Sequence, residues 1–128
     1  MKEKEYDLED RLVSFSARIV ELARMLPNTK AANYIRDQLT RCGSSPAMNY
    51  GEAQGAESRD DFIHKMKVVL KELKETRVCL KLIIHQQLIK NEKLVIDLRN
   101  ECEELVAITA KSIITATNNN KKEIKRDQ

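Results

Sequence analysis

Apolar residues recur at alternating steps of three and four residues along most of the chain, and this spacing constrains the fold more than any other feature. Such steps place apolar side chains on one side of an α-helix. Only 3 Gly and 2 Pro occur among 128 residues, which leaves too few turns for a fold built of short strands. We therefore predict an all-α protein and exclude an all-β fold.

Four segments carry an apolar stripe, and residues that stop or cap helices separate them. These residues are Pro27, which stops the first segment, and the capping candidates Asn28 or Thr29, Ser58 with Asp61, and Asn91. The third segment is expected to end near Lys90. Four helices joined by short turns predict an antiparallel up-down-up-down four-helix bundle.

Pro46 lies inside the second segment. The preceding residues, Gly43 to Ser45, are typical of a break in which Ser45 caps a new helix. The apolar stripe, however, keeps its period on both sides of Pro46. This continuity favours a single helix that is kinked near Pro46.

One domain with a tail is predicted. Residues 1–117 are expected to form the bundle. Residues 118–128, NNNKKEIKRDQ, hold four basic residues, two acidic residues and one apolar side chain. Because such a segment buries too little apolar surface to fold, we expect a basic, disordered C-terminal tail.

The net charge of +3 is distributed unevenly. Residues 1–10 carry two Lys against five acids, whereas residues 59–90 carry eight Lys or Arg against four acids. The candidate nucleic-acid-binding residues are Lys65, Lys67, Lys71, Lys74, Lys81, Lys121, Lys122, Lys125 and Arg126. A row of lysines is also typical of a solvated helix face, so charge alone leaves both interpretations open. The few aromatic residues form no platform on which bases could stack, so we expect a contact with nucleic acid to depend mainly on its phosphate backbone and its shape.

Cysteine usage and apolar run lengths bear on location. Cys42, Cys79 and Cys102 lie at apolar helical positions without a CxxC pair, so we interpret them as small core residues. Apolar runs are far shorter than the about 18 residues that cross a bilayer. Residues 1–10 are acidic and lack a signal-peptide core. We expect a reducing, cytoplasmic location and no membrane partner.

The sequence offers no catalytic or cofactor site. His64 and His85 belong to no zinc or di-iron pattern. Gly51 and Gly55 lack the residues that complete a nucleotide-binding loop. We therefore predict no metal site, no cofactor and no enzymatic activity.

Several polar residues are interpreted as structural. Glu52 and Glu75 come near each other if the second and third helices pair, but no nucleophile or metal ligand accompanies them. Because buried charges have to be paired, a polar network is the favoured interpretation. The predicted network contains Asn49, Glu52, Ser58, Asp61, Glu72, Glu75 and Arg77.

A second, shallower apolar stripe lies beside the first on the N-terminal segment. It consists of Val13, Ala17 and Val20. One bundle does not need this additional apolar surface, so we predict that it forms an oligomer interface.

Several motifs carry a resemblance to a known family. They are QL-x-R-C at residues 38–42 before a Ser-Ser-Pro turn, N-x-x-E at 49–52, S-x-x-D-F at 58–62, and the region from Leu73 to Glu75. Over about residues 7–117 the chain resembles the bacterial four-helix-bundle proteins encoded in intervening sequences of 23S rRNA genes, historically described as ribosomal-protein-like. This resemblance implies a homopentamer around a central channel. It also implies kinship with accessory variability proteins of diversity-generating retroelements, which work with a reverse transcriptase and bind nucleic acid.

Two functions remain open from the sequence. The first is a non-enzymatic, self-associating bundle that binds structured nucleic acid, RNA in particular, through its basic surface. The alternative is a structural protein-interaction adaptor, such as an accessory subunit of a retroelement reverse transcriptase. A carboxylate enzyme is a third possibility and would contain bound metal.

Overall fold

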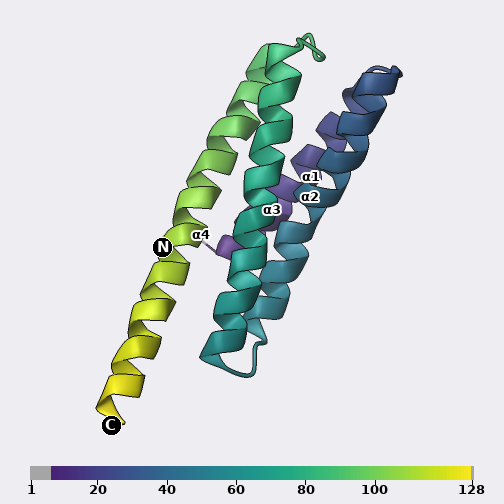
Figure 1. The fold of residues 1–128 in the computed structure, drawn as a ribbon. Helices are drawn as coiled ribbons and strands as arrows, with labels where there is room; N and C mark the ends of the chain where they lie inside the picture. The colour runs from purple at the N-terminus through teal and green to yellow at the C-terminus, as the bar shows by residue number, and fades with distance from the viewer. Residues whose placement is uncertain (1–6, 128) are drawn as a thin grey trace.

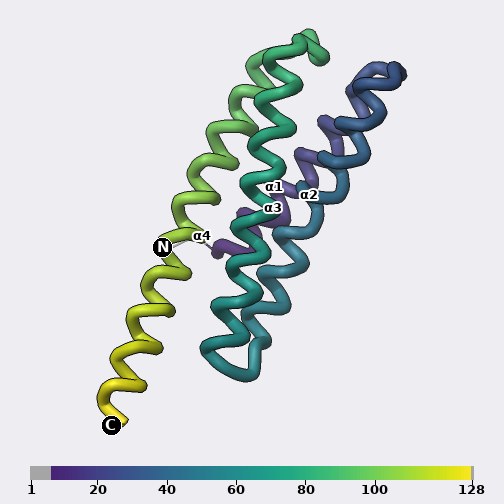
Figure 2. Tube along the Cα trace, in the orientation of Figure 1, coloured from purple at the N-terminus to yellow at the C-terminus, as the bar shows by residue number. Residues whose placement is uncertain are grey.

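The computed structural model describes residues 7–127 and contains four helices. They are α1 (Leu8–Met25), α2 (Lys30–Gln54), α3 (Arg59–His85) and α4 (Glu92–Arg126). Their connections alternate between the two ends of the molecule, so successive helices run antiparallel (Figures 1 and 2). The prediction of an all-α, antiparallel four-helix bundle is confirmed.

Side-chain caps begin all four helices. The side chains of Asp7, Thr29, Ser58 and Asn91 accept backbone N–H groups at 2.9, 3.2, 3.0 and 3.3 Å, respectively. Of the two candidates after Pro27, Thr29 is the cap. Each cap satisfies a backbone donor that has no partner within its own helix, which fixes where the helix starts.

The apolar stripes meet in one core. Phe15 and Ile19 of α1, Leu39 of α2, Leu73 of α3 and Leu105 of α4 are buried in the same cluster. All three cysteines are buried in this cluster as free thiols, as their positions in the sequence predicted.

The second helix passes through Pro46 without ending. Proline removes one backbone hydrogen bond from a helix interior. In the turn before it, the Ser44 hydroxyl donates to the Thr40 carbonyl at 2.6 Å and the Ser45 hydroxyl donates to the Arg41 carbonyl at 3.0 Å. The prediction of one helix is confirmed, and Ser45 does not cap a new one.

Packing between helices is uneven. α2 packs along α3 and α3 along α4 over most of their lengths, and α1 packs along α2, but α1 and α4 touch only over a short stretch. Arg11 of α1 connects α1 to α4 through a bidentate ion pair with Glu101, at 2.6 and 2.8 Å, and a contact with Glu104 at 2.5 Å. α4 is 17 residues longer than α1 (35 minus 18), about 25 Å at 1.5 Å per residue. It therefore extends past the turn between α2 and α3 (Figure 1).

α1 and α2 approach each other closely at Gly43. A Cβ atom at this position would lie 3.1 Å from the Cβ of Ile19 and closer still to its Cγ2. The missing side chain of Gly43 thus allows the β-branched Ile19 to pack directly on the α2 backbone.

The third helix ends at His85, five residues before the predicted end near Lys90. Gln87 has φ 52°, in the left-handed region. Its N–H donates to the Ile84 carbonyl, and the Leu88 N–H donates to the Ile83 carbonyl, both at 3.1 Å. These two bonds form a Schellman motif, in which a left-handed residue terminates the helix.

The predicted disordered tail requires a correction, because α4 continues through residues 118–126. Two contacts hold this extension against the start of α3. The Asn120 amide donates to Asp60 at 2.7 Å, and Arg59 pairs with Glu123 at 2.6 Å. Lys, Glu and Arg have high helix propensity. Together with these two contacts, that propensity continues α4 through a segment whose low apolar content predicted disorder.

Candidate functional site

Three lysines form a row on the outward side of α3. Lys67, Lys71 and Lys74 are exposed and line a shallow groove of about 430 Å³ together with Leu70 and Val78. Helical rise separates neighbouring members of this lysine row by about 6 and 4.5 Å. None of the three takes part in an ion pair within residues 7–127.

The other two α3 candidates differ from the lysine row. Lys65 is half-buried and pairs with Glu52 of α2 at 3.5 Å. Lys81 is exposed but lies seven residues beyond Lys74, about 10 Å along the helix. The structure therefore separates the five lysines into a central row, one paired residue and one distant residue.

The remaining cations occupy the end of α4. Lys121, Lys122, Lys125 and Arg126 are all exposed on its last two turns. Because the contacts of Asn120 and Glu123 bind these turns to the start of α3, the four cations project from a helix and not from a free tail.

The predicted polar residues form separate pairs in the structure. The Asn49 amide donates to Glu72 at 2.7 Å, linking α2 to α3. The other pairs are Glu52 with Lys65, Glu75 with Arg41 at 3.4 Å, Arg77 with Glu103 at 3.0 Å, and Ser58 with the backbone N–H of Asp61. Glu52 and Glu75 bond to α2–α3 partners at different levels of the bundle, so the two carboxylates do not form an acid/base pair with each other.

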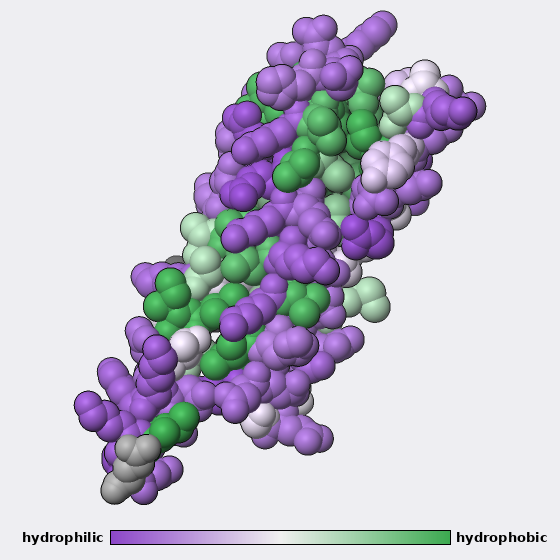
Figure 3. Space-filling model, viewed as in Figure 1, coloured by the Kyte–Doolittle hydropathy of each residue, from purple (hydrophilic) through white to green (hydrophobic). Residues whose placement is uncertain are grey.

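The second stripe of α1 is open to solvent in the single chain. Val13 is 52% exposed, Ala17 is exposed and Val20 is half-buried. Further apolar side chains, including Val78 and Leu82, are exposed on α3. Figure 3 shows apolar surface among polar residues over α3 and α4. More than one face of the bundle thus has apolar surface available for a partner.

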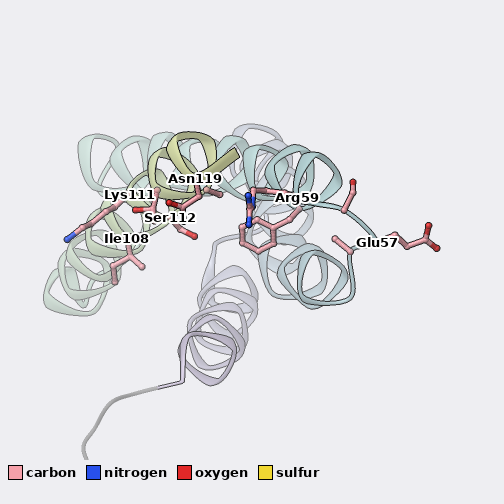
Figure 4. A pocket seen from close by; sticks show the side chains of 11 residues that line it. Glu57, Arg59, Ile108, Lys111, Ser112 and Asn119 are labelled. Carbon is pink, nitrogen blue, oxygen red and sulfur yellow. The ribbon is translucent and has the colours of Figure 1, made fainter. Parts of the chain in front are cut away.

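A groove that the sequence did not predict lies between the start of α3 and the C-terminal half of α4. Its volume is about 710 Å³. Its lining includes Arg59 from α3 and Ile108, Lys111, Ser112 and Asn119 from α4 (Figure 4). Arg11 of α1 contacts α4 at Glu101 and Glu104, and the groove lies further along α4, between Ile108 and Asn119. The unequal lengths of the first and fourth apolar stripes were the signal that could have predicted it.

Residues 7–127 contain no group of three or more His, Cys, Asp or Glu side chains that could hold a metal ion. His64 and His85 are both exposed. In the same residues, no helix combines the length and the apolar character that crossing a bilayer requires.

Comparison with known proteins identifies the family. Residues 4–111 match the family model described as 23S rRNA-intervening sequence protein. Among solved structures, the chain is similar to a protein of unknown function from the S23 ribosomal protein family of Bacteroides thetaiotaomicron VPI-5482. The two chains are 32% identical, the match covers 84% of this chain and 98% of the other, and the TM-score is 0.77. Curated protein sequences give no match. Because the family model spans most of the chain, this protein belongs to the 23S rRNA-intervening sequence protein family.

Proposed function

We propose that the protein is a non-enzymatic, self-associating helical bundle that binds structured RNA through the phosphate backbone. The observation that carries this proposal is the lysine row of Lys67, Lys71 and Lys74, whose ammonium groups are exposed and unpaired within the described residues. Unpaired cations at such a spacing can each neutralise a phosphate and release a counterion.

The surroundings of the lysine row favour contact with the backbone over reading of bases. Tyr34 is the only exposed aromatic side chain among residues 7–127, so bases have no stacking platform. The cations at the end of α4 add a second basic site on the same chain. The family description refers to a 23S rRNA intervening sequence, which makes structured RNA the first nucleic acid to test.

Self-association would strengthen RNA binding by a surface that carries little charge in one chain. One chain offers only three unpaired lysines in its row and a net charge of +3. In a ring of five chains, the number implied by the family resemblance, the row is repeated, and contacts add through effective concentration. The exposed stripe of Val13, Ala17 and Val20 is the surface that we assign to this assembly.

The experiment measures binding over a salt series. Wild type and a variant with Lys67, Lys71 and Lys74 changed to Glu are titrated with structured RNA and with duplex DNA. The control changes Lys30, Lys90 and Lys93 to Glu; these residues are exposed at the end of the bundle where α1 connects to α2 and α3 to α4, away from the middle of α3. Both variants lower the net charge by six but at different positions, and the control also breaks the exposed pair of Lys93 with Asp97 at 2.9 Å.

We expect the lysine-row variant to lose most of its affinity and the control to keep it. Loss of three phosphate contacts should make the plot of log K against log salt shallower by about 2 to 3 for duplex DNA. No binding of wild type at low salt, or equal losses in the two variants, would contradict the proposal.

The alternative function is a protein-interaction adaptor, such as an accessory subunit of a reverse transcriptase. Two exposed apolar residues of α3 favour it: Val78, which lines the groove of the lysine row, and Leu82, about one turn further along the helix. Co-purification with a reverse transcriptase encoded beside the gene, without RNA binding by the isolated protein, would support the adaptor. A gene inside an rRNA locus would favour the RNA-binding function.

A further inference from the structure

Two of the three cysteines meet between α2 and α3. Cys42 lies on α2 and Cys79 on α3, two helices that pack along most of their length. Both residues line a groove of about 270 Å³, whose wall also includes Tyr34 and Arg41. Cys79 is 8% exposed and Cys42 is fully buried. The sequence interpretation of inert core residues did not place these two thiols together, because they are 37 positions apart in the chain.

The third cysteine has a different environment. The Cys102 thiol donates to the Leu73 carbonyl at 3.2 Å, and burial raises its pKa to about 12. It does not line the groove that the other two share. Cys102 is therefore an unreactive thiol in the same chain and serves as an internal control.

The neighbouring thiol of Cys79 favours the thiolate form of Cys42. It lowers the pKa of Cys42 from 9.0 to about 7, and Thr76 and Arg41 act in the same direction. Burial and the carboxylate of Glu75 oppose this shift. The pKa of Cys79 is raised, chiefly by the neighbouring Cys42 sulfur, which favours retention of the Cys79 proton, and then by burial. A thiolate beside a thiol is the pairing that thiol–disulfide chemistry requires.

We propose that Cys42 and Cys79 form a reversible disulfide between α2 and α3 when the protein meets a hydroperoxide that enters through their shared groove. The Cys42 thiolate attacks the peroxide oxygen, the O–O bond breaks, and the leaving oxygen takes a proton to become an alcohol or water. Cys42 is then a sulfenic acid. The Cys79 sulfur attacks the Cys42 sulfur, the S–S bond forms, the S–O bond breaks, and hydroxide leaves with the proton of Cys79 as water. Overall two thiols are oxidised by two electrons and one peroxide is reduced.

The position of the pair determines what the disulfide changes. It would close a loop that contains the turn between α2 and α3, joining two helices that already pack along most of their length. The oxidised chain should therefore melt at a higher temperature than the reduced chain. Because Cys42 is fully buried, oxidation should be slower than that of an exposed thiol peptide.

The experiment treats the reduced, full-length protein with hydrogen peroxide and counts free thiols by alkylation and mass spectrometry. We expect the wild type to fall from three alkylatable thiols to one, with a mass loss of about 2 Da that dithiothreitol reverses. Peptide mapping should show Cys42 joined to Cys79 within one chain, and Cys102 alkylated. This mapping needs no variant, so it holds even if a substitution disturbs folding.

Three variants sharpen the test. Cys102→Ala should still lose both remaining thiols, whereas Cys42→Ala and Cys79→Ala should form no intramolecular disulfide. Cys42→Ser and Cys79→Ser replace either alanine variant that fails to show a wild-type circular dichroism spectrum. Three free thiols after peroxide treatment that fully oxidises a control peptide would overturn the proposal. A disulfide that involves Cys102 or joins two chains would also overturn it.

Discussion

The close approach of α1 and α2 at Gly43 leads to a prediction about stability, and the structure determines whether the expected change is a gain or a loss. Gly43→Ala removes a glycine from a helix interior, which by helix propensity alone stabilises the protein by about 1 kcal/mol. The new Cβ, however, would lie 3.1 Å from the Cβ of Ile19 and closer to its Cγ2. The packing term opposes the propensity term, so the net effect depends on whether Ile19 can move.

Ile19 has little freedom to move. It is fully buried, and a β-branched side chain in a helix has one strongly preferred χ1 rotamer. Rotation about χ1 moves Cγ2 but does not move Cβ, so relief requires the two helix backbones to separate. Overpacking of this kind costs about 1 to 3 kcal/mol. We expect a net destabilisation of about 1 kcal/mol, or a Tm lower by about 4 °C.

Thermal melts followed by circular dichroism, at one protein concentration, measure this effect. Gly51→Ala is the matched control, because Gly51 lies on the same helix, is exposed, and has no atom within 4 Å of its added Cβ. This control should be more stable than wild type by up to about 1 kcal/mol, and its Tm should therefore be higher. The two alanine substitutions thus share the propensity gain and differ in packing.

A double-mutant cycle tests the assigned cause. Ile19→Ala alone should cost about 2 to 5 kcal/mol. In the double variant the closer contact, with Cγ2 of Ile19, is gone and only the 3.1 Å contact between the two Cβ atoms remains, so the combined loss should be smaller than the sum by about 1 kcal/mol. The reasoning is refuted if Gly43→Ala melts at or above the Gly51→Ala control, or if the two losses simply add.

Three further predictions test features of the same structure. Gln87→Gly should stabilise the protein by about 0.5 to 1 kcal/mol in a urea titration, because glycine adopts the left-handed conformation of Gln87 without a Cβ penalty; a loss would show that the Gln87 side chain contributes more than its backbone costs. Asn49→Ala should lower the stability by about 1 to 2 kcal/mol, because it breaks the half-buried hydrogen bond to Glu72 of α3. Glu52→Ala should lower it by less than about 0.5 kcal/mol, because the ion pair of Glu52 with Lys65 is long and the Glu52 side chain is 61% exposed. Equal melting temperatures of the two variants would refute this distinction. Val13→Glu with Val20→Glu should shift light scattering toward smaller species at unchanged helicity, and a wild type that already scatters as a monomer would refute the assigned interface.

Sequence periodicity predicted the helices and their core because each signal was local. Ser58 and Asn91 act at the helix starts that they cap, as does Thr29, one of two candidates for the start of α2, so these three starts could be identified from the chain alone. Pro27 likewise marked the end of α1. The end of α3 could not be identified in this way, because Gln87 takes a conformation that is ordinarily signalled by Gly or Asn.

Contacts between distant residues account for the other differences. The final turns of α4 depend on Arg59 and Asp60 at the start of α3, and no local feature of residues 118–126 indicates those partners. The lysines of α3 were predicted as a group, but the pairing of Lys65 with Glu52 required knowing how α2 and α3 are aligned. Likewise, Cys42 and Cys79 line one groove because two helices pair, which neither segment alone indicates.

The limited packing between α1 and α4 has a consequence for hydrogen exchange. α2, α3 and α4 pack against one another in sequence, whereas α1 is held mainly by α2 and reaches α4 over a short, Arg11-bridged stretch. Two grooves of about 500 and 200 Å³ also lie along α1, each with one lining residue from α4. Such a seam opens at a lower free energy than the whole bundle. Amide protons of α1 should therefore exchange as a separate, faster unit, and a partner that covers Val13 and Val20 should slow them more than those of α3.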